Sequence, residues 1–359
     1  MRVVFRVDAS LTMGTGHVMR CLTLARTLRE HGHACLFITR EHAGNLNTLI
    51  GHEGVSLHAL PIGRAQDNDL DHSAWLGASQ EEDAAACQVP IAAWRPDWLV
   101  VDHYALDHRW ETQATPAGCR VLVIDDLADR RHVCDLLLDQ NLGRKVEDYR
   151  AWVPDLCTLL VGPGNALLRA DFSLLRHSSL ARREQADLQN VLIALGGVDH
   201  HNYTGSILEA LKSCELPDDI RFTVVLGATA PHLQAVTAAA RSCPWPVEVL
   251  SGIDDMAKRM LEADLAVGAA GGTSWERCCL GVPTLLVILA ENQRSGALAL
   301  AATGAAVLID ASSPLVEQLQ SAFDQLQTLP RRQQMASAAS RITDGRGTER
   351  LQQLMESRQ

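Results

Sequence analysis

Residues 5–28 read FRVDASLTMGTGHVMRCLTLARTL and predict a strand, a glycine-bearing turn and a helix in direct succession. The strand is apolar and ends at Asp8, and Gly14 and Gly16 permit a tight bend with close backbone approach. An apolar stripe at the spacing of one helix face follows the turn: Val18, Leu22, Ala25 and Leu28. A strand that turns directly into such a helix favours an α/β fold.

The same alternation continues along the chain. In the first half, the strand candidates are 2–8, 33–39, 55–60, 97–103, 119–125, 134–140 and 157–162. In the second half, they are 190–197, 220–227, 247–253, 264–270, 282–289 and 305–310, and a helical tail follows from about Pro314. We therefore predict an α/β protein of two Rossmann-like domains facing across a cleft, with ligands at the carboxyl ends of the strands.

The domain boundary is expected at a polar segment, RHSSLARREQADLQ, which covers residues 176–189 and has no strand character. With this segment as the linker, an N-terminal Rossmann-like domain covers 1–175 and a C-terminal Rossmann-like domain covers 190–345. Residues 346–359 are expected to form a C-terminal helix, to which we assign no function.

Composition limits the class of protein. The chain has 359 residues, 47% of them hydrophobic, which is enough for two domains. Its formal net charge of -11 argues against a broad nucleic-acid surface. The longest apolar run, 282–290, is too short to span a bilayer, no secretory signal is seen, and ten scattered cysteines form no CxxC pair. These features predict a cytoplasmic protein without a membrane or nucleic-acid partner.

The opening turn differs from a dinucleotide-binding turn, because His17 and Val18 follow Gly16 and the third glycine is missing. The second strand also ends in Arg40 and Glu41 without a clear ribose-binding acid, so a nicotinamide site is poorly supported. The positive end of a helix keeps an imidazole neutral and able to accept a proton from water. His17 is therefore a candidate general base, with Asp8 as a side chain that could orient its ring. A structural role in the turn is the alternative.

A second glycine turn lies within residues 264–293. The strand there runs into four small residues that open a helix, and Glu276 lies near the start of that helix: Gly271, Gly272, Thr273 and Ser274. Small residues admit a diphosphate, and amides and hydroxyls bind it. Glu276 is placed to accept hydrogen bonds from a ribose diol. An ordinary capped helix with an acidic first turn is the alternative.

Two further strand ends carry candidate ligand contacts. Gly196 and Gly197 end a strand where a phosphate or sugar would lie. The segment VVDHYALDH, residues 100–108, places three polar side chains that could hold sugar hydroxyls: Asp102, His103 and Tyr104. The histidines of HGH (31–33) precede their strand, at the edge opposite the cleft, and DHH (199–201) lacks a partner motif such as HExxH. We therefore predict no metal site and no cofactor.

Four motifs, GTGHVMR, VVDHY, NALLRADF and AAGGTSWE…GVPTLLV…ENQ, together resemble the pseudaminic acid biosynthesis hydrolases. Those enzymes release UDP and the free sugar from UDP-2,4-diacetamido-2,4,6-trideoxy-β-L-altropyranose. The family is related to the glycosyltransferase that adds GlcNAc to lipid I, and shares its glycosyltransferase B fold. The resemblance implies that His17 is the general base and that the second domain binds UDP through Gly271, Gly272, Thr273, Ser274 and Glu276. It also implies ligand contacts, with less defined roles, at Arg20, Arg169 and Asn292.

The implied reaction is direct attack of His17-activated water on the anomeric carbon, with inversion and without a cofactor. UDP is a good leaving group, and fixed amides and cations can stabilise it without a metal. Two rival functions remain open. One is a glycosyltransferase of the same fold that uses an alcohol acceptor, and the other is a non-catalytic module that binds a nucleotide sugar.

Overall fold

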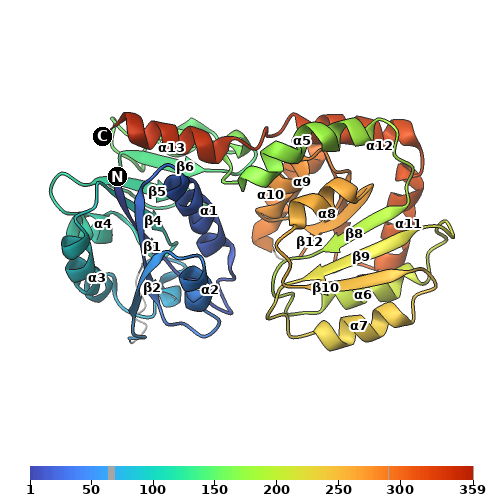
Figure 1. Cartoon of the computed structure of the whole chain (residues 1–359), viewed down its shortest axis with the longest axis horizontal. Helices are drawn as coiled ribbons and strands as arrows, with labels where there is room; N and C mark the ends of the chain where they lie inside the picture. The colour runs from blue at the N-terminus through green and yellow to red at the C-terminus, as the bar shows by residue number, and fades with distance from the viewer. Residues whose placement is uncertain (64–68, 290, 359) are drawn as a thin grey trace. The chain divides into compact units, whose positions relative to one another are not determined.

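The computed structural model describes residues 1–63, 69–289 and 291–358, without the side chain of Asn292. The chain divides into two compact units (Figure 1). The N-terminal unit consists of Met1–Leu167 and the last segment from Arg346, and the C-terminal unit consists of Leu168–Gly345. Much of the segment expected as a linker, 176–189, is helical instead, because α5 (Ala170–Arg183) belongs to the C-terminal unit.

The N-terminal unit contains a parallel sheet of seven strands among the described residues, in the order β3-β2-β1-β4-β5-β6-β7. Each strand coincides with one of the predicted apolar runs: β1 (Arg2–Val7), β2 (Ala34–Arg40), β3 (Ser56–Leu60), β4 (Trp98–Asp102), β5 (Arg120–Ile124), β6 (Leu136–Asp139) and β7 (Thr158–Val161). The predicted α/β class is therefore confirmed for this half of the chain.

Successive side chains of β1 face opposite sides of this sheet, as the period of a strand requires. Val3, Phe5 and Val7 pack in one core with α1 (Gly16–Glu30) and α2 (Asn47–His52). Val4 belongs to the core on the opposite face, with α3 (Gln80–Trp94) and α4 (His108–Ala114). Both faces of the sheet are thus covered by helices (Figure 1).

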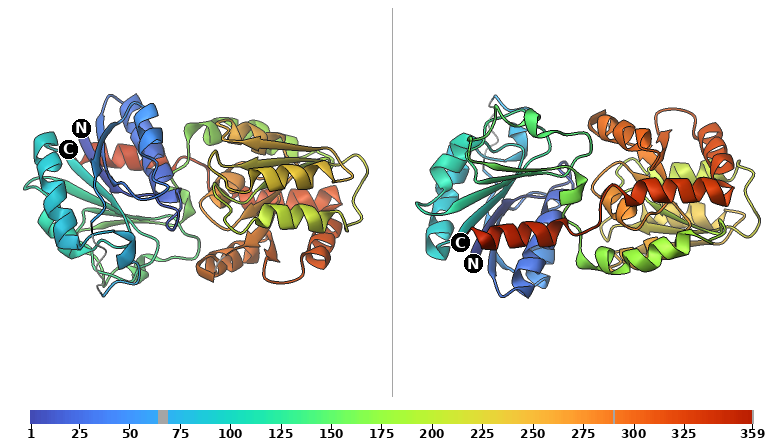
Figure 2. Two further views of the ribbon diagram at one scale, coloured as in Figure 1. Left: turned by 90° about the horizontal axis from the view of Figure 1, so that it is seen from below. Right: turned by 90° about the horizontal axis from the view of Figure 1, so that it is seen from above.

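The C-terminal helix α13 (Gly347–Ser357) completes the N-terminal unit. Leu351 and Met355 are buried in the same core as α1, and Figures 1 and 2 show α13 in red beside α1 in blue. Just beyond the helix, Arg358 donates a hydrogen bond to the backbone carbonyl of Asp135. The end of the chain, to which the sequence assigned no role, is therefore part of the N-terminal core.

The C-terminal unit has a second parallel sheet, six strands among the described residues in the order β10-β9-β8-β11-β12-β13. Its strands are β8 (Asn190–Ala194), β9 (Arg221–Leu226), β10 (Val247–Ser251), β11 (Leu265–Ala269), β12 (Thr284–Ile288) and β13 (Val307–Asp310). The main hydrophobic core of this unit lies between one face of the sheet and three helices: α6 (Tyr203–Leu211), α7 (Leu233–Arg241) and α11 (Leu315–Leu326). The remaining helices are α5, α8 (Met256–Glu262), α9 (Thr273–Cys279), α10 (Glu291–Ala302) and α12 (Leu329–Ser340).

A charged residue, Arg6, lies one position before the end of β1. Arg6 is fully buried on the α3 face, where its Nε and Nη2 donate to the two carboxylate oxygens of Asp83 at 2.9 and 2.7 Å. Asp83 also accepts from Arg40 at 2.5 Å and from the Trp110 indole at 3.0 Å. Burial by itself raises the pKa of Asp83, but Arg6 outweighs it and holds that pKa below its usual value. Asp83 is therefore the acceptor on which this buried cluster depends.

Asp83→Ala should destabilise the protein by about 3–5 kcal/mol, because the Arg6 and Arg40 guanidinium groups stay buried without their carboxylate. Calorimetric melting of the full chain measures the effect. Asp155→Ala, at an exposed loop position, is the matched control and should leave the melting temperature within error. Equal melting curves for the two variants would contradict the role of Asp83.

Candidate active site

The turn between β1 and α1 places His17 in the first turn of a helix. Gly14 has φ +78°, a left-handed conformation that favours glycine, and its N–H donates to the Ser10 carbonyl at 2.9 Å. A Cβ at Gly16, where α1 begins, would meet open space. The His17 side chain is 11% exposed. The turn therefore leaves one side of the ring accessible.

The ring of His17 is held by a carboxylate from the neighbouring strand. Its Nδ1 lies 2.6 Å from Oδ1 of Asp102, the last residue of β4 and fully buried. Nη2 of Arg20 also lies 3.2 Å from Nδ1, but the contact with Asp102 is much shorter. Because a carboxylate can only accept, the proton of the shorter contact belongs to Nδ1, and Nε2 is left as an acceptor. This is the geometry of a general base with an orienting carboxylate.

Arg20, one turn further along α1, binds the same carboxylate in a bidentate manner. Its Nε and Nη2 donate to the two oxygens of Asp102 at 2.6 and 2.7 Å, and its Nη1 donates to Asp126 at 2.8 Å. Burial by itself raises the pKa of Asp102, but the charge of Arg20 and the hydrogen bonds from Arg20 and His17 outweigh it and hold that pKa well below its usual range. Asp102 is consequently ionised at any pH near neutrality.

Asp102 takes the orienting role that the sequence suggested for Asp8. The carboxylate of Asp8 forms an ion pair with Arg6 at 2.7 Å, accepts from the Arg40 amide and lies 3.3 Å from Nε2 of His103. The reason is the strand period: Val7, which faces α1, is in register with Asp102, so Asp8 faces the other side. His103 is also buried, beside Asp8, and lies on the side of the sheet away from His17.

Tyr104 does lie beside His17. Its ring meets the imidazole edge-on, with centroids 4.6 Å apart at 85°, and its hydroxyl donates to Asp126 at 2.5 Å. Asp126, which sequence reasoning missed, follows β5 and thus lies at the same carboxyl edge of the sheet. Asp102 was selected as a polar residue at the carboxyl end of a strand, and the same criterion could have selected Asp126. For His72 and Trp75, whose rings contact Tyr104, the sequence offered no such signal.

The second glycine turn, in the C-terminal unit, is built on a buried arginine. Gly271 and Gly272 are exposed, but the hydroxyls of Thr273 and Ser274 accept hydrogen bonds from Arg277 at 3.1 and 3.0 Å. Arg277 is 2% exposed and also donates to the Ala269 carbonyl. Its hydrogen-bond partners are neutral oxygens, and no ion pair joins it to a carboxylate in the part of the chain that the structure describes. A buried guanidinium, that of Arg277, therefore lies directly beneath the turn.

Arg277 was missed by the sequence reasoning, although it follows Glu276 directly. A Cβ at Gly268 would lie 2.3 Å from its Nη1, so glycine at that position makes room for the guanidinium. Burial lowers the pKa of Arg277 to about 10, which still leaves it charged at neutral pH.

Glu276 is half-buried at the start of α9. Burial raises its pKa to about 7, against the opposing charges of Arg169 and Arg277. Arg169 itself precedes α5, pairs with Asp171 at 3.2 Å and donates to the Asp254 carbonyl. A carboxylate with such a pKa changes its charge near neutral pH.

The remaining predicted positions are less informative. Gly196 and Gly197 are exposed after β8, with Gly196 at φ +111°. The Asn292 side chain lies outside the described residues. Among the described residues, no group of histidine, cysteine and acidic side chains is arranged to hold a metal ion.

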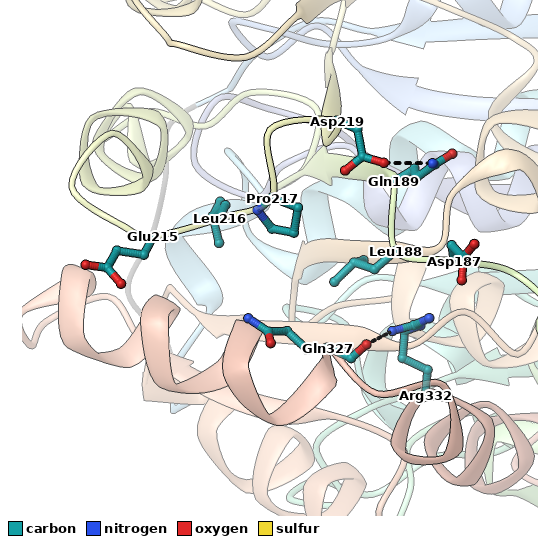
Figure 3. A pocket seen from close by; sticks show the side chains of 9 residues that line it. All are labelled: Asp187, Leu188, Gln189, Glu215, Leu216, Pro217, Asp219, Gln327 and Arg332. Carbon is teal, nitrogen blue, oxygen red and sulfur yellow. Dashed lines mark hydrogen bonds between the residues drawn. The ribbon is translucent and has the colours of Figure 1, made fainter.

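A hollow of about 470 Å³ in the C-terminal unit lies elsewhere (Figure 3). Gln189 and Asp219, joined by a hydrogen bond of 2.9 Å, line it next to the first residues of β8 and β9. It is therefore at the amino edge of the sheet, whereas the glycine turns follow the carboxyl ends of the strands.

Comparison with known proteins agrees with the two-unit architecture. Residues 195–354 match the glycosyltransferase family 28 C-terminal domain. A UDP-2,4-diacetamido-2,4,6-trideoxy-β-L-altropyranose hydrolase of Campylobacter jejuni is 24% identical over 85% of this chain and 97% of its own. The chain is a distant homologue of that hydrolase. An uncharacterised Methanocaldococcus jannaschii protein is 25% identical over 82% of the chain, which spans only 57% of that relative.

The fold is that of the glycosyltransferase B enzymes. The crystal structure of Acinetobacter baumannii MurG superposes with a TM-score of 0.73 at 20% identity, over 99% of both chains. The predicted fold is thus confirmed. No helix among the described residues is long and apolar enough to cross a membrane.

The hydrogen bond to Asp102 predicts the tautomer of His17. At a pH where the ring is neutral, long-range ¹H–¹⁵N correlation spectra should show the proton on Nδ1, because Asp102 accepts it there. The spectrum of His17→Asn identifies the signal. A neutral ring with its proton on Nε2 would mean that Asp102 does not orient it.

Proposed function

We propose that this chain hydrolyses UDP-2,4-diacetamido-2,4,6-trideoxy-β-L-altropyranose to UDP and the free sugar, as a step of pseudaminic acid biosynthesis in the cytoplasm. The observation that carries the proposal is the contact of 2.6 Å between His17 and Asp102, which leaves Nε2 of a partly exposed imidazole free to accept a proton. The homologous hydrolase, which this chain matches over nearly its whole length, supports the same reaction.

In the proposed step, Nε2 of His17 removes a proton from a water molecule as its oxygen attacks the anomeric carbon. The bond between that carbon and the UDP oxygen breaks, and its electron pair leaves with UDP. The imidazolium that forms is stabilised by the ionised Asp102, whose negative charge Arg20 holds in place. Direct attack by water inverts the anomeric configuration.

The C-terminal unit binds the UDP part in this proposal. The exposed Gly271 and Gly272 let the diphosphate approach the backbone, and the buried charge of Arg277 attracts it. Glu276 accepts hydrogen bonds from the ribose hydroxyls, with Gly196, Gly197, Arg169 and Asn292 as further contacts. Because UDP leaves as a stable anion, a strong general acid is not needed.

A glycosyltransferase is the second candidate. The match of residues 195–354 to the glycosyltransferase family 28 C-terminal domain favours it. The same His17 would then remove the proton of an alcohol instead of water. The two candidates differ in one result: only the hydrolase consumes the UDP-sugar when no acceptor is present.

His17→Asn should lose hydrolysis on the order of 10²–10⁴-fold in kcat, because general-base catalysis is removed. The UDP affinity should stay near that of the wild type, since the proposed UDP contacts lie in the other unit. Hydrolysis in ¹⁸O-water, followed by NMR before mutarotation, should give an inverted sugar that carries the label.

Three results would contradict this mechanism. Label in UDP would mean attack at phosphorus. Retention of configuration would mean a covalent or two-step route. Near-full activity of His17→Asn would remove His17 from the chemistry.

UDP binding should strengthen as the pH rises through about 7, because burial raises the Glu276 pKa to about 7 and only the carboxylate accepts two ribose hydrogen bonds. Between about pH 6 and 8 we expect a change of roughly tenfold in Kd. Glu276→Gln is the matched control for calorimetry, because UDP itself titrates equally with both proteins. Identical pH dependence of the two proteins would exclude Glu276 from the ribose site.

A further inference from the structure

Three aromatic rings form a continuous surface that begins at His17. Tyr104, which meets His17 edge-on, lies 5.8 Å from Trp75 in a stacked arrangement of 25°. His72 contacts both rings, at 4.5 Å from Trp75 and 5.4 Å from Tyr104. We call His72, Trp75 and Tyr104 the aromatic wall. His72, Trp75 and Tyr104 are partly exposed, so the wall can be touched by a ligand.

The segment that carries Trp75 is anchored on both sides. Leu76 is fully buried in the core beneath α3, and the Gly77 carbonyl accepts from the amide of Gly63 at 2.9 Å. Ser73 is also buried, in the short helical turn that ends at Trp75. The backbone that carries the indole is thus held in place by its buried neighbours, which lowers the entropy cost of ordering this segment against a ligand.

We propose that the aromatic wall receives the methyl-bearing side of an N-acylated 6-deoxy UDP-amino sugar and thereby selects the sugar that reaches His17. This inference rests on the proposed function, which places the anomeric carbon one water molecule from Nε2 of His17. The wall starts at the Tyr104 ring that contacts His17, so the sugar ring at that position lies beside it.

The chemistry of the wall matches such a sugar. Aromatic faces bury methyl and methine groups and offer little to hydroxyls. A diacetamido 6-deoxy hexose carries three methyl groups, whereas UDP-GlcNAc carries one and exposes a 6-hydroxyl that the wall would desolvate. Each methyl in an apolar site changes selectivity by roughly tenfold or more. The wall would therefore favour the acylated deoxy sugar.

The test compares two donors, UDP-2,4-diacetamido-2,4,6-trideoxy-β-L-altropyranose and UDP-GlcNAc. The preference is the ratio of kcat/KM for the diacetamido sugar nucleotide to kcat/KM for UDP-GlcNAc. Trp75→Ala should lower this ratio on the order of 10–100-fold, mainly through a higher KM for the diacetamido sugar nucleotide. Trp75→Phe, which keeps an aromatic face, should retain most of the preference. Trp94→Ala is the matched control: this partly buried tryptophan contacts Arg2 on the same unit, away from the wall, and its loss should leave the preference unchanged.

Calorimetry separates this inference from the proposed function. In a His17→Asn background, where substrate persists, Trp75→Ala should weaken binding of the diacetamido sugar nucleotide and leave the Kd of UDP unchanged. That result supports the wall even if the chain proves to be a transferase. The inference is overturned if the wild type shows no preference between the donors or if Trp75→Ala keeps the preference. It is also overturned if Trp75→Ala weakens the binding of UDP as much as that of the diacetamido sugar nucleotide.

Discussion

The buried carboxylate of Asp102 is the group on which the candidate site depends. A carboxylate without solvent is stable only when charges and hydrogen bonds replace the lost water, and here three residues of one helix provide them: His17, Arg20 and, more weakly, the Cys21 thiol. His17 and Arg20 are three residues apart on α1, so both side chains reach the same strand end. The contacts that satisfy Asp102 therefore hold the imidazole in one orientation, so the fold itself positions the candidate base.

The sequence predicted His17 as a candidate base, which stays a prediction, but did not predict the carboxylate that the structure places against it. The GTGHVMR turn identifies His17, because the strand, the glycines and the helix are consecutive. Asp8 and Asp102 both end strands, and strand parity decides between them: Asp102 is in register with Val7 and faces α1, whereas Asp8 faces the Arg6 cluster. That register joins residues far apart in the chain, so composition and spacing do not reveal it. The same holds for Asp126.

The strands were predictable for a simple physical reason: a parallel sheet covered on both faces produces continuous apolar runs. Charged segments were harder to interpret. The polar stretch after residue 176 reads as a linker, yet it continues α5, where Arg183 donates to the Met260 carbonyl and Arg176 to that of Ser340. Arginines that bind carbonyls at the ends of other helices resemble solvent-exposed charges in a sequence. The last helix was predicted as a separate C-terminal element, whereas in the structure it packs on α1 in the N-terminal core.

The two glycine turns follow the carboxyl ends of strands in their own units, but their charges are opposite. Below the first turn, Asp102 and Asp126 surround one arginine, so with a neutral His17 the cluster carries one net negative charge, which suits the formation of an imidazolium. Below the second, Arg277 is buried and its hydrogen-bond acceptors are neutral oxygens, with Glu276 as the neighbouring carboxyl group. The proposed hydrolysis would use each field separately: a negative field suits the group that accepts a proton, and a positive field suits the group that holds the departing phosphate charge.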